Sequence, residues 1–299
     1  MEKARVCGVS WKSHKEKLAE YQVLGAERVH MPERFDFYDS TYGHFTEHVF
    51  DIIRKETFGV DIGQDNWLTV DEYERFLSWL GPAPEHHVLD VACGSGGPAL
   101  YLAKTAGCRM TGMDANEKGV AAATQMAVRA NQTGRVRFTV GNASSRLPFD
   151  DNTFHALLCI DSMNHFPDRL AVFREWHRVL CAGHRAIFTD PVVITGPVTN
   201  DELAIRSSIG LFLFVPPGVN ERLIEEAGFL LVRQEDVSNN AALVSGRWHE
   251  SRQRHKNELL EIEGENRFEG LQRFFASVHQ LTTERRLSRI VYLAEKRAG

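Results

Sequence analysis

A glycine-rich loop between a β-rich run and a helical run is the feature of this chain with the clearest capacity for chemistry. Residues 88–97 read VLDVACGSGG, and Pro98 suits the first turn of the helix that follows. Small residues at such a turn let a bound group touch the backbone, where larger side chains would block it. The loop therefore predicts a binding site for a nucleotide-like cofactor at the end of a strand.

Two cofactors satisfy this glycine pattern. Residues 94–99 (GSGGPA) match the dinucleotide pattern G-x-G-x-x-G/A. Asp114 follows Gly94 by twenty residues, the spacing of the ribose-binding acid in NAD-binding folds. The loop alone leaves NAD and S-adenosylmethionine equally open.

Asp90, at the end of the strand before the loop, separates the two cofactors. Dinucleotide folds normally keep this position apolar, whereas a ligand with an ammonium group suits a carboxylate. S-adenosylmethionine has no phosphate, so a loop without Lys or Arg loses nothing. The chain also ends without a second mononucleotide half. These features favour S-adenosylmethionine.

Three downstream segments extend the pattern: 111–116 (TGMDAN), 140–161 and 174–191. Together with the loop they resemble, in order and spacing, the motifs of class I S-adenosylmethionine-dependent methyltransferases. The resemblance covers about residues 85–191 and is greatest to ubiquinone/menaquinone-type and sarcosine/dimethylglycine-type enzymes. It implies a Rossmann-like α/β fold with a seven-stranded sheet, its last strand antiparallel, and the cofactor across the C-terminal edge of the strands.

The resemblance also implies where the cofactor binds. Asp114 would accept both ribose hydroxyls, and Asn142 with Ala143 would meet the adenine edge. Gln64 would bind the methionine carboxylate, and Trp67 would shield the sulfonium by a cation-π contact or pack in the core. The other expected cofactor contacts are Asp90, Ala92, Gly94, Gly96, Ala115 and Ile160. Ala92 replaces a usual glycine and Asn142 a frequent aspartate, so we expect altered contacts and not lost binding.

Methyl transfer is an in-line displacement at an already activated carbon, so the protein mainly aligns the reactants. A base is needed only where the nucleophile carries a proton. His165 is the candidate base, oriented by Asp161, with a structural histidine as the alternative. Candidate acceptor contacts, each with core packing as the alternative, are Tyr38, Phe212, Phe214, Trp248 and His249. His44 and His48 share a helix face, but two histidines without further ligands predict no metal site.

Alternating helical and β-rich patterns must position these groups. Residues 1–84 are predicted to form an N-terminal helical segment, with helices at 15–24, 44–58 and 70–80. Residues 85–299 are predicted to form the cofactor-binding domain, with strands at 87–91, 109–113, 136–140, 155–160, 185–190, 229–236 and 286–295. Strands that alternate with helices are typical of βαβ units in a parallel sheet. Insertions at about 192–218 and 238–283 are expected to form a lid, the second as a long charged helical stretch.

The composition of the chain indicates which classes of partner are expected. The 299 residues carry a formal net charge of −5 with scattered Lys and Arg, which disfavours nucleic acid as a partner. Five cysteines without C-x-x-C spacing indicate reduced thiols, and no apolar run approaches the about 18 residues of a membrane span. We expect a cytoplasmic enzyme that methylates a small molecule on N or O. The alternatives are C-methylation of a quinone- or isoprenoid-type acceptor, or an NAD-dependent oxidoreductase; the oligomeric state stays open.

Overall fold

Seven strands form one mixed sheet in the computed structural model, which describes residues 37–45 and 47–298. Their order is β3 (Val136–Val140), β2 (Arg109–Asp114), β1 (His87–Val91), β4 (Phe154–Cys159), β5 (Leu180–Ile194), β7 (Leu287–Lys296) and β6 (Phe229–Asp236). Neighbours from β3 to β5 pair in parallel, whereas β7 runs antiparallel to β5 and β6. This confirms the predicted Rossmann-like sheet with an antiparallel last strand. The helix predicted at 15–24 lies outside the described residues.

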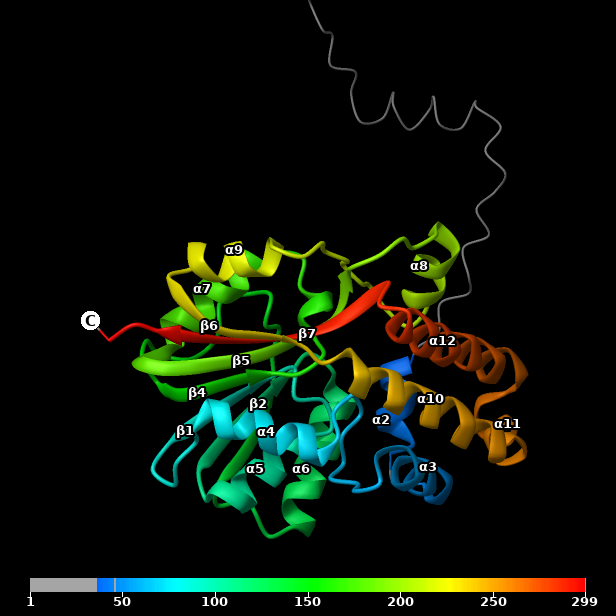
Figure 1. Cartoon of the computed structure of the whole chain (residues 1–299). Helices are drawn as coiled ribbons and strands as arrows, with labels where there is room; N and C mark the ends of the chain where they lie inside the picture. The colour runs from blue at the N-terminus through cyan, green and yellow to red at the C-terminus, as the bar shows by residue number, and fades with distance from the viewer. Residues whose placement is uncertain (1–36, 46, 299) are drawn as a thin grey trace, which may run out of the picture. The chain divides into compact units, whose positions relative to one another are not determined.

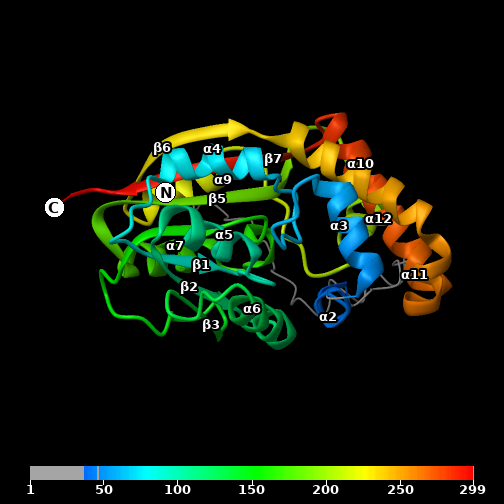
Figure 2. The ribbon, with the colours of Figure 1, turned by 90° about the horizontal axis from the view of Figure 1, so that it is seen from below.

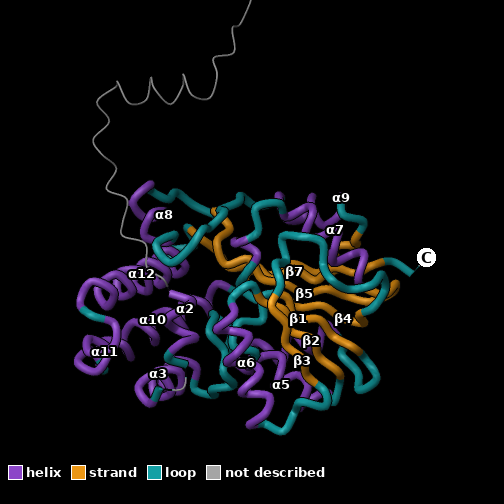
Figure 3. The backbone as a smooth tube through the Cα atoms, turned by 180° about the vertical axis from the view of Figure 1, so that it is seen from behind, coloured by secondary structure: helices purple, strands orange, loops and turns teal. Residues whose placement is uncertain are grey.

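Helices cover both faces of the sheet (Figures 1 and 3). One face carries α4 (Val70–Leu80), α5 (Gly97–Ala106) and α6 (Glu117–Arg129), and the other carries α7 (Arg169–Val179) and α9 (Val219–Glu226). Successive side chains of a strand point to opposite faces. In β4, Leu158 packs with α4 and α5 while Leu157 packs with α7, and both are fully buried. A strand covered on both faces is therefore apolar throughout.

A helical cap lies at one end of the sheet (Figures 1 and 2). It contains α2 (Phe37–Gly43), α3 (His48–Phe58), α8 (Asn200–Arg206), α10 (Ser238–Arg254), α11 (Lys256–Glu263) and α12 (Glu265–Thr283). Aromatic contacts hold the cap together, since the Trp248 ring lies 5.5 Å from Phe58 and 4.9 Å from Phe275 between centroids. Residues of α2, α8, α10 and α12 line the same cavity as the ends of β1 and β2. The cap thus covers the carboxyl edge of the sheet.

Several predicted elements have other bounds in the structure. Helix α3 begins at His48 and not at residue 44. The stretch at 238–283 is three helices, because the chain turns at His255 and at Gly264, whose φ of 74° glycine adopts at little cost. Strand β5 extends to Ile194, into the first expected insertion, because its end pairs with Leu287 and Ser288 of β7. Helix α2 and helix α8 were not predicted. Among the described helices, none is long and apolar enough to cross a membrane.

The division into segments at residue 84 stays a prediction. Helix α4, on its N-terminal side, packs on the sheet through Tyr73 and Phe76, which share an apolar cluster with Val88 of β1. The buried Tyr73 hydroxyl also donates a hydrogen bond of 3.1 Å to the carbonyl of Pro98 at the start of α5. This part of the N-terminal segment therefore contributes directly to the core beneath the cofactor loop.

Candidate cofactor and acceptor site

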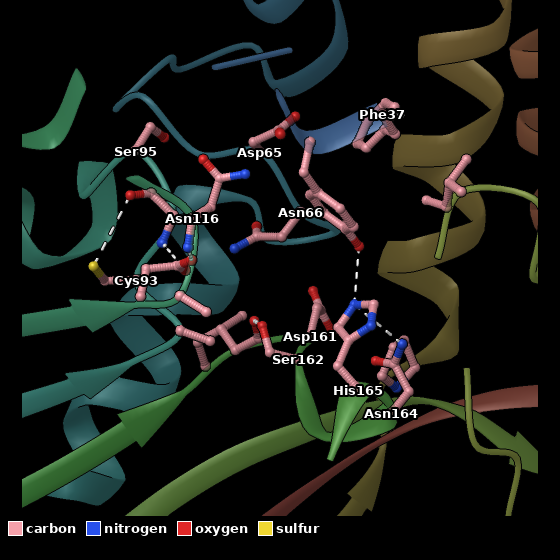
Figure 4. A pocket seen from close by; sticks show the side chains of 18 of the residues that line it. Phe37, Asp65, Asn66, Cys93, Ser95, Asn116, Asp161, Ser162, Asn164 and His165 are labelled. Atoms are coloured by element: carbon pink, nitrogen blue, oxygen red, sulfur yellow. Dashed lines mark hydrogen bonds between the residues drawn. The ribbon is translucent and has the colours of Figure 1, made fainter. Parts of the chain in front are cut away.

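A cavity of about 440 Å³ lies between the strand ends and the cap. Acidic groups at the ends of β1, β2 and β4 line one part of it, and aromatic groups of the cap line the other. Figure 4 shows Asp65, Asn66, Asp161 and His165 facing this space. Its volume lies within the range of about 300–1,000 Å³ that is typical of small-molecule sites.

The loop after β1 turns through several left-handed residues. Gly94 and Gly96 have φ values of 52° and 77°. A Cβ atom on Gly96 would lie 2.5 Å from the Phe138 ring, and one on Gly97 would lie 2.3 Å from the Ile62 carbonyl oxygen. Gly96 is thus required for packing beneath the loop, whereas Gly94 lines the cavity.

Asp114 is fixed at the end of β2 by two backbone amides. The amide of Gly94 donates to Oδ2 and the amide of Asn116 donates to Oδ1, each at 2.8 Å. Burial raises the pKa of Asp114 despite these hydrogen bonds. The carboxylate is held in one orientation beside the cofactor loop, with its remaining lone pairs available to a ligand.

Asp90, at the end of β1, is buried and accepts no hydrogen bond from the described part of the chain. Asp90 is 3% exposed and lines the cavity. Burial, and then repulsion from Asp114, raises the pKa of Asp90 well above its ordinary value. An unpaired buried carboxylate is unfavourable unless a cation approaches it. This end of the cavity therefore fits a ligand with a positively charged group.

Tyr38 and His165 form a hydrogen-bonded pair across the cavity. The Nδ1–H of His165 donates to the Leu211 carbonyl at 3.0 Å, so Nε2 accepts from the Tyr38 hydroxyl at 2.9 Å. Burial, with a smaller contribution from Arg206, lowers the pKa of His165 and keeps it neutral. Burial raises the pKa of Tyr38, which stays protonated. The pair joins α2 to the loop after β4.

Asp161 does not orient His165, contrary to the sequence-based expectation. Its Oδ1 accepts from Arg289 Nε at 2.6 Å and from the Thr189 hydroxyl at 2.8 Å. Its Oδ2 accepts from the backbone amide of Trp67 at 3.0 Å. These partners occupy the carboxylate, and Asp161 instead anchors the segment that carries Trp67.

Most predicted site residues meet at the cavity. Those that line it are Tyr38, Trp67, Asp90, Ala92, Gly94, Asp114, Ala115, Asn142, Ala143, Ile160, Asp161, His165, Phe212 and Trp248. Gln64, Gly96, Phe214 and His249 do not line it. The Gln64 amide is buried, where it accepts from Ile62 N at 2.8 Å and donates to the Val60 carbonyl at 3.1 Å. It shapes the segment before α4 and has no access to a ligand.

Three further polar residues of the cavity were missed from the sequence. Tyr42 shares helix α2 with Tyr38, and its hydroxyl lies over Gly94, 2.5 Å from where a Cβ atom would stand. Burial raises the pKa of Asp65 to about 7. Arg206 ends α8 beside the aromatic groups. The spacing of Tyr38 and Tyr42, four apart, offered a helical signal, whereas no pattern marked Arg206.

A mostly parallel sheet covered on both faces, with a glycine-rich loop after β1 and an acid at the end of β2, defines a Rossmann-like cofactor-binding protein. Residues 88–183 match the family model described as a methyltransferase domain. Over 191 residues, 64% of this chain and 67% of the relative, the chain is 30% identical to the sarcosine/dimethylglycine N-methyltransferase of Halorhodospira halochloris.

Other similarities agree. Methyltransferase GfsG of Streptomyces halstedii is 33% identical over 177 residues, which cover 57% of this chain and 61% of that protein. The cyclopropane synthase MmaA2 from Mycobacterium tuberculosis shares the fold with a TM-score of 0.74 at 15% identity, covering 87% of this chain and 98% of that one. The match spans between 46% and 61% of several curated relatives.

The chain belongs to the S-adenosylmethionine-dependent methyltransferase family, whose members take their methyl group from S-adenosylmethionine. The site fits that group, because the partnerless carboxylate of Asp90 lies where an ammonium group can neutralise it. The cavity offers Asp65 and Asp114 as further acids to a cofactor that carries two cationic centres. The NAD-dependent oxidoreductase alternative is thereby set aside.

Proposed function

We propose that this protein transfers the methyl group of S-adenosylmethionine to a small-molecule acceptor under the helical cap. The cavity carries the proposal, because it joins the acidic strand ends to an aromatic pocket that α2, α8, α10 and α12 cover. Its volume of about 440 Å³ suits small ligands.

On the cofactor side, we propose that Asp114 accepts the ribose hydroxyls and Asp90 receives the ammonium group. The fixed orientation of Asp114 and the partnerless burial of Asp90 support these roles. Asn142 and Ala143, which follow β3, would border the adenine. Ala92, Gly94, Ala115 and Ile160 complete the proposed contacts.

On the acceptor side, we propose that the aromatic groups and the Tyr38–His165 pair align the nucleophile for in-line displacement. Where the nucleophile carries a proton, the Tyr38 hydroxyl can take it while passing its own proton to Nε2 of His165. A proton route of this kind favours N- or O-methylation over C-methylation. Phe212, Trp67 and Trp248 would exclude water from the reacting atoms.

The test uses S-adenosylmethionine with an isotopically labelled methyl group and a small-metabolite extract. We expect products that are heavier by one labelled methyl group, identified by mass spectrometry, and fewer with Tyr38→Phe. Isothermal titration calorimetry measures the affinities for S-adenosylhomocysteine and for NADH separately from the activity. The proposal would be overturned if NADH binds and S-adenosylhomocysteine does not. It would also be overturned if the label appears in protein and in no small molecule.

We also propose a cytoplasmic location. The described cysteines are free thiols, and Cys93, Cys108 and Cys159 are buried in the domain. Thiols of this kind are typical of proteins in a reducing compartment. Fractionation of expressing cells followed by immunodetection tests the location, and recovery from a secreted fraction would contradict it.

A further inference from the structure

Arg206 is a buried arginine without a hydrogen-bond or ion-pair partner among the described residues. It is 2% exposed, lines the cavity, and its guanidinium forms no hydrogen bond or ion pair with the described residues. The other buried arginines of the described chain all pair with acids: Arg169 with Asp190, Arg252 with Glu263, and Arg289 with Glu72 and Asp161. No described residue uses the hydrogen-bonding capacity of Arg206, which is therefore available to a bound ligand.

Aromatic rings surround this guanidinium. Its central carbon lies 5.0 Å from the Phe212 centroid, 5.1 Å from Phe274 and 5.8 Å from Trp67. Ring faces attract the cation but accept no conventional hydrogen bonds from its five N–H groups. Burial lowers the pKa of Arg206 to about 10, so the group stays charged at neutral pH. A buried and unpaired cation attracts an anionic ligand.

The guanidinium belongs to the acceptor part of the cavity. Phe212 packs against Arg206 and also against the His165 ring, with centroids 5.0 Å apart. The charge of Arg206 contributes to the lowered pKa of His165. Asp90 and Asp114, which we propose bind the cofactor, lie at the ends of β1 and β2. Arg206 instead ends α8 of the cap. An anion bound here would lie beside the Tyr38–His165 pair.

We propose that Arg206 binds a carboxylate of the methyl acceptor, so that the substrate is an organic acid with an amine or hydroxyl group. This inference rests on the proposed function. Arg206 is the sole Lys or Arg among the described residues of the cavity, which also includes Asp65, Asp90, Asp114 and Asp161. One planar guanidinium matches one carboxylate through two hydrogen bonds. A dianionic phosphate fits this cavity less well, because its two charges would face a single cation among several acids.

The test compares three acids with their neutral amides: benzoate, 3-phenylpropionate and N,N-dimethylglycine. Calorimetric titrations use the full chain saturated with S-adenosylhomocysteine. We expect at least one acid to bind about tenfold or more tightly than its amide, as hydrogen bonds to charged groups allow. Arg206→Met should abolish this preference, and Arg206→Lys should keep part of it. Arg174→Met is the control, because Arg174 pairs with Glu226 at the surface and does not line the cavity.

Three outcomes would overturn the inference. The wild type could bind every acid no better than its amide, or it could prefer phenyl phosphate to each acid. Alternatively, Arg206→Met could weaken S-adenosylhomocysteine binding while the acid preference remains. This result would show that the guanidinium binds the carboxylate of the cofactor's own amino acid part. Failure of the proposed function is distinguishable, because an acid preference that depends on Arg206 without any methylated product would overturn only the activity.

Discussion

Arg289→Met should destabilise the protein strongly, because Arg289 neutralises two buried carboxylates. The fully buried Arg289 of β7 donates from Nε to Asp161 at 2.6 Å and from Nη1 to Glu72 at 2.5 Å. Asp161 follows β4 and Glu72 lies on α4, so one guanidinium joins three elements beside the cavity. Methionine keeps much of the side-chain volume but leaves both acids without their cation.

The expected loss is about 3–5 kcal/mol of unfolding free energy, the usual cost of removing one partner from a buried ion pair. At about 2–4 °C per kcal/mol for a domain of this size, the thermal midpoint should fall by about 6–20 °C. Urea unfolding followed by circular dichroism measures the free energy. Arg174→Met is the control, since Arg174 and Glu226 form an exposed pair at 3.6 Å that contributes about 0–1 kcal/mol.

The pH dependence gives a second readout of the same substitution. Burial already raises the pKa of Glu72, and removing Arg289 raises it further. Above the ordinary pKa of a glutamate, the folded variant then holds a proton that the unfolded chain has released, so stability falls as pH rises. The loss relative to wild type should be larger at pH 8 than at pH 5. A loss below about 1 kcal/mol, or an equal loss at both pH values, would refute the assignment of Arg289 as the neutralising cation.

Three other substitutions test the site. Asp90→Asn should weaken S-adenosylhomocysteine binding about tenfold or more in calorimetry, because the amide cannot neutralise an ammonium group; unchanged affinity would contradict that role. Tyr38→Phe should lower kcat about tenfold to a hundredfold with little change in the KM for S-adenosylmethionine, since it removes the hydroxyl bonded to His165; an unchanged kcat would exclude the proton route. Ala92→Gly should raise the unfolding free energy by up to about 1 kcal/mol, because φ at Ala92 is 57°, and a loss of stability would show that its methyl packing outweighs the strain.

The strands and the loop could be predicted because local residues define them. The predicted strand at 136–140 matches the structure at both ends, and the helix predicted after the glycine-rich loop is present with Pro98 in its first turn. Strands that alternate with helices predicted a parallel sheet, and the strands from β3 to β5 do pair in parallel. These features depend on residues that are close together in the sequence.

The insertions that form most of the cap were predicted as a lid, but the contacts of the cap could not be predicted, because they depend on residues that are far apart in the sequence. Asp161 precedes His165 by four positions in the chain but pairs with Arg289, 128 positions away. Tyr38 meets His165 across 127 positions. A short helix such as α8 has too few residues for a periodic pattern, so the burial of Arg206 beside aromatic rings left no trace in the sequence.

Two non-glycine residues at the cavity have a strained backbone conformation that was not predicted from their residue types. Ala92 and Asp161, after β1 and β4, have φ values of 57° and 56°, a region where a non-glycine residue costs about 1–3 kcal/mol. At Asp161, hydrogen bonds from Arg289, Thr189 and Trp67 hold the strained backbone and offset its cost. Ala92 has no side-chain hydrogen bond to hold it. Glycine should therefore stabilise position 92, whereas at position 161 it would also remove the anchor of Trp67 and leave Arg289 with a single acid.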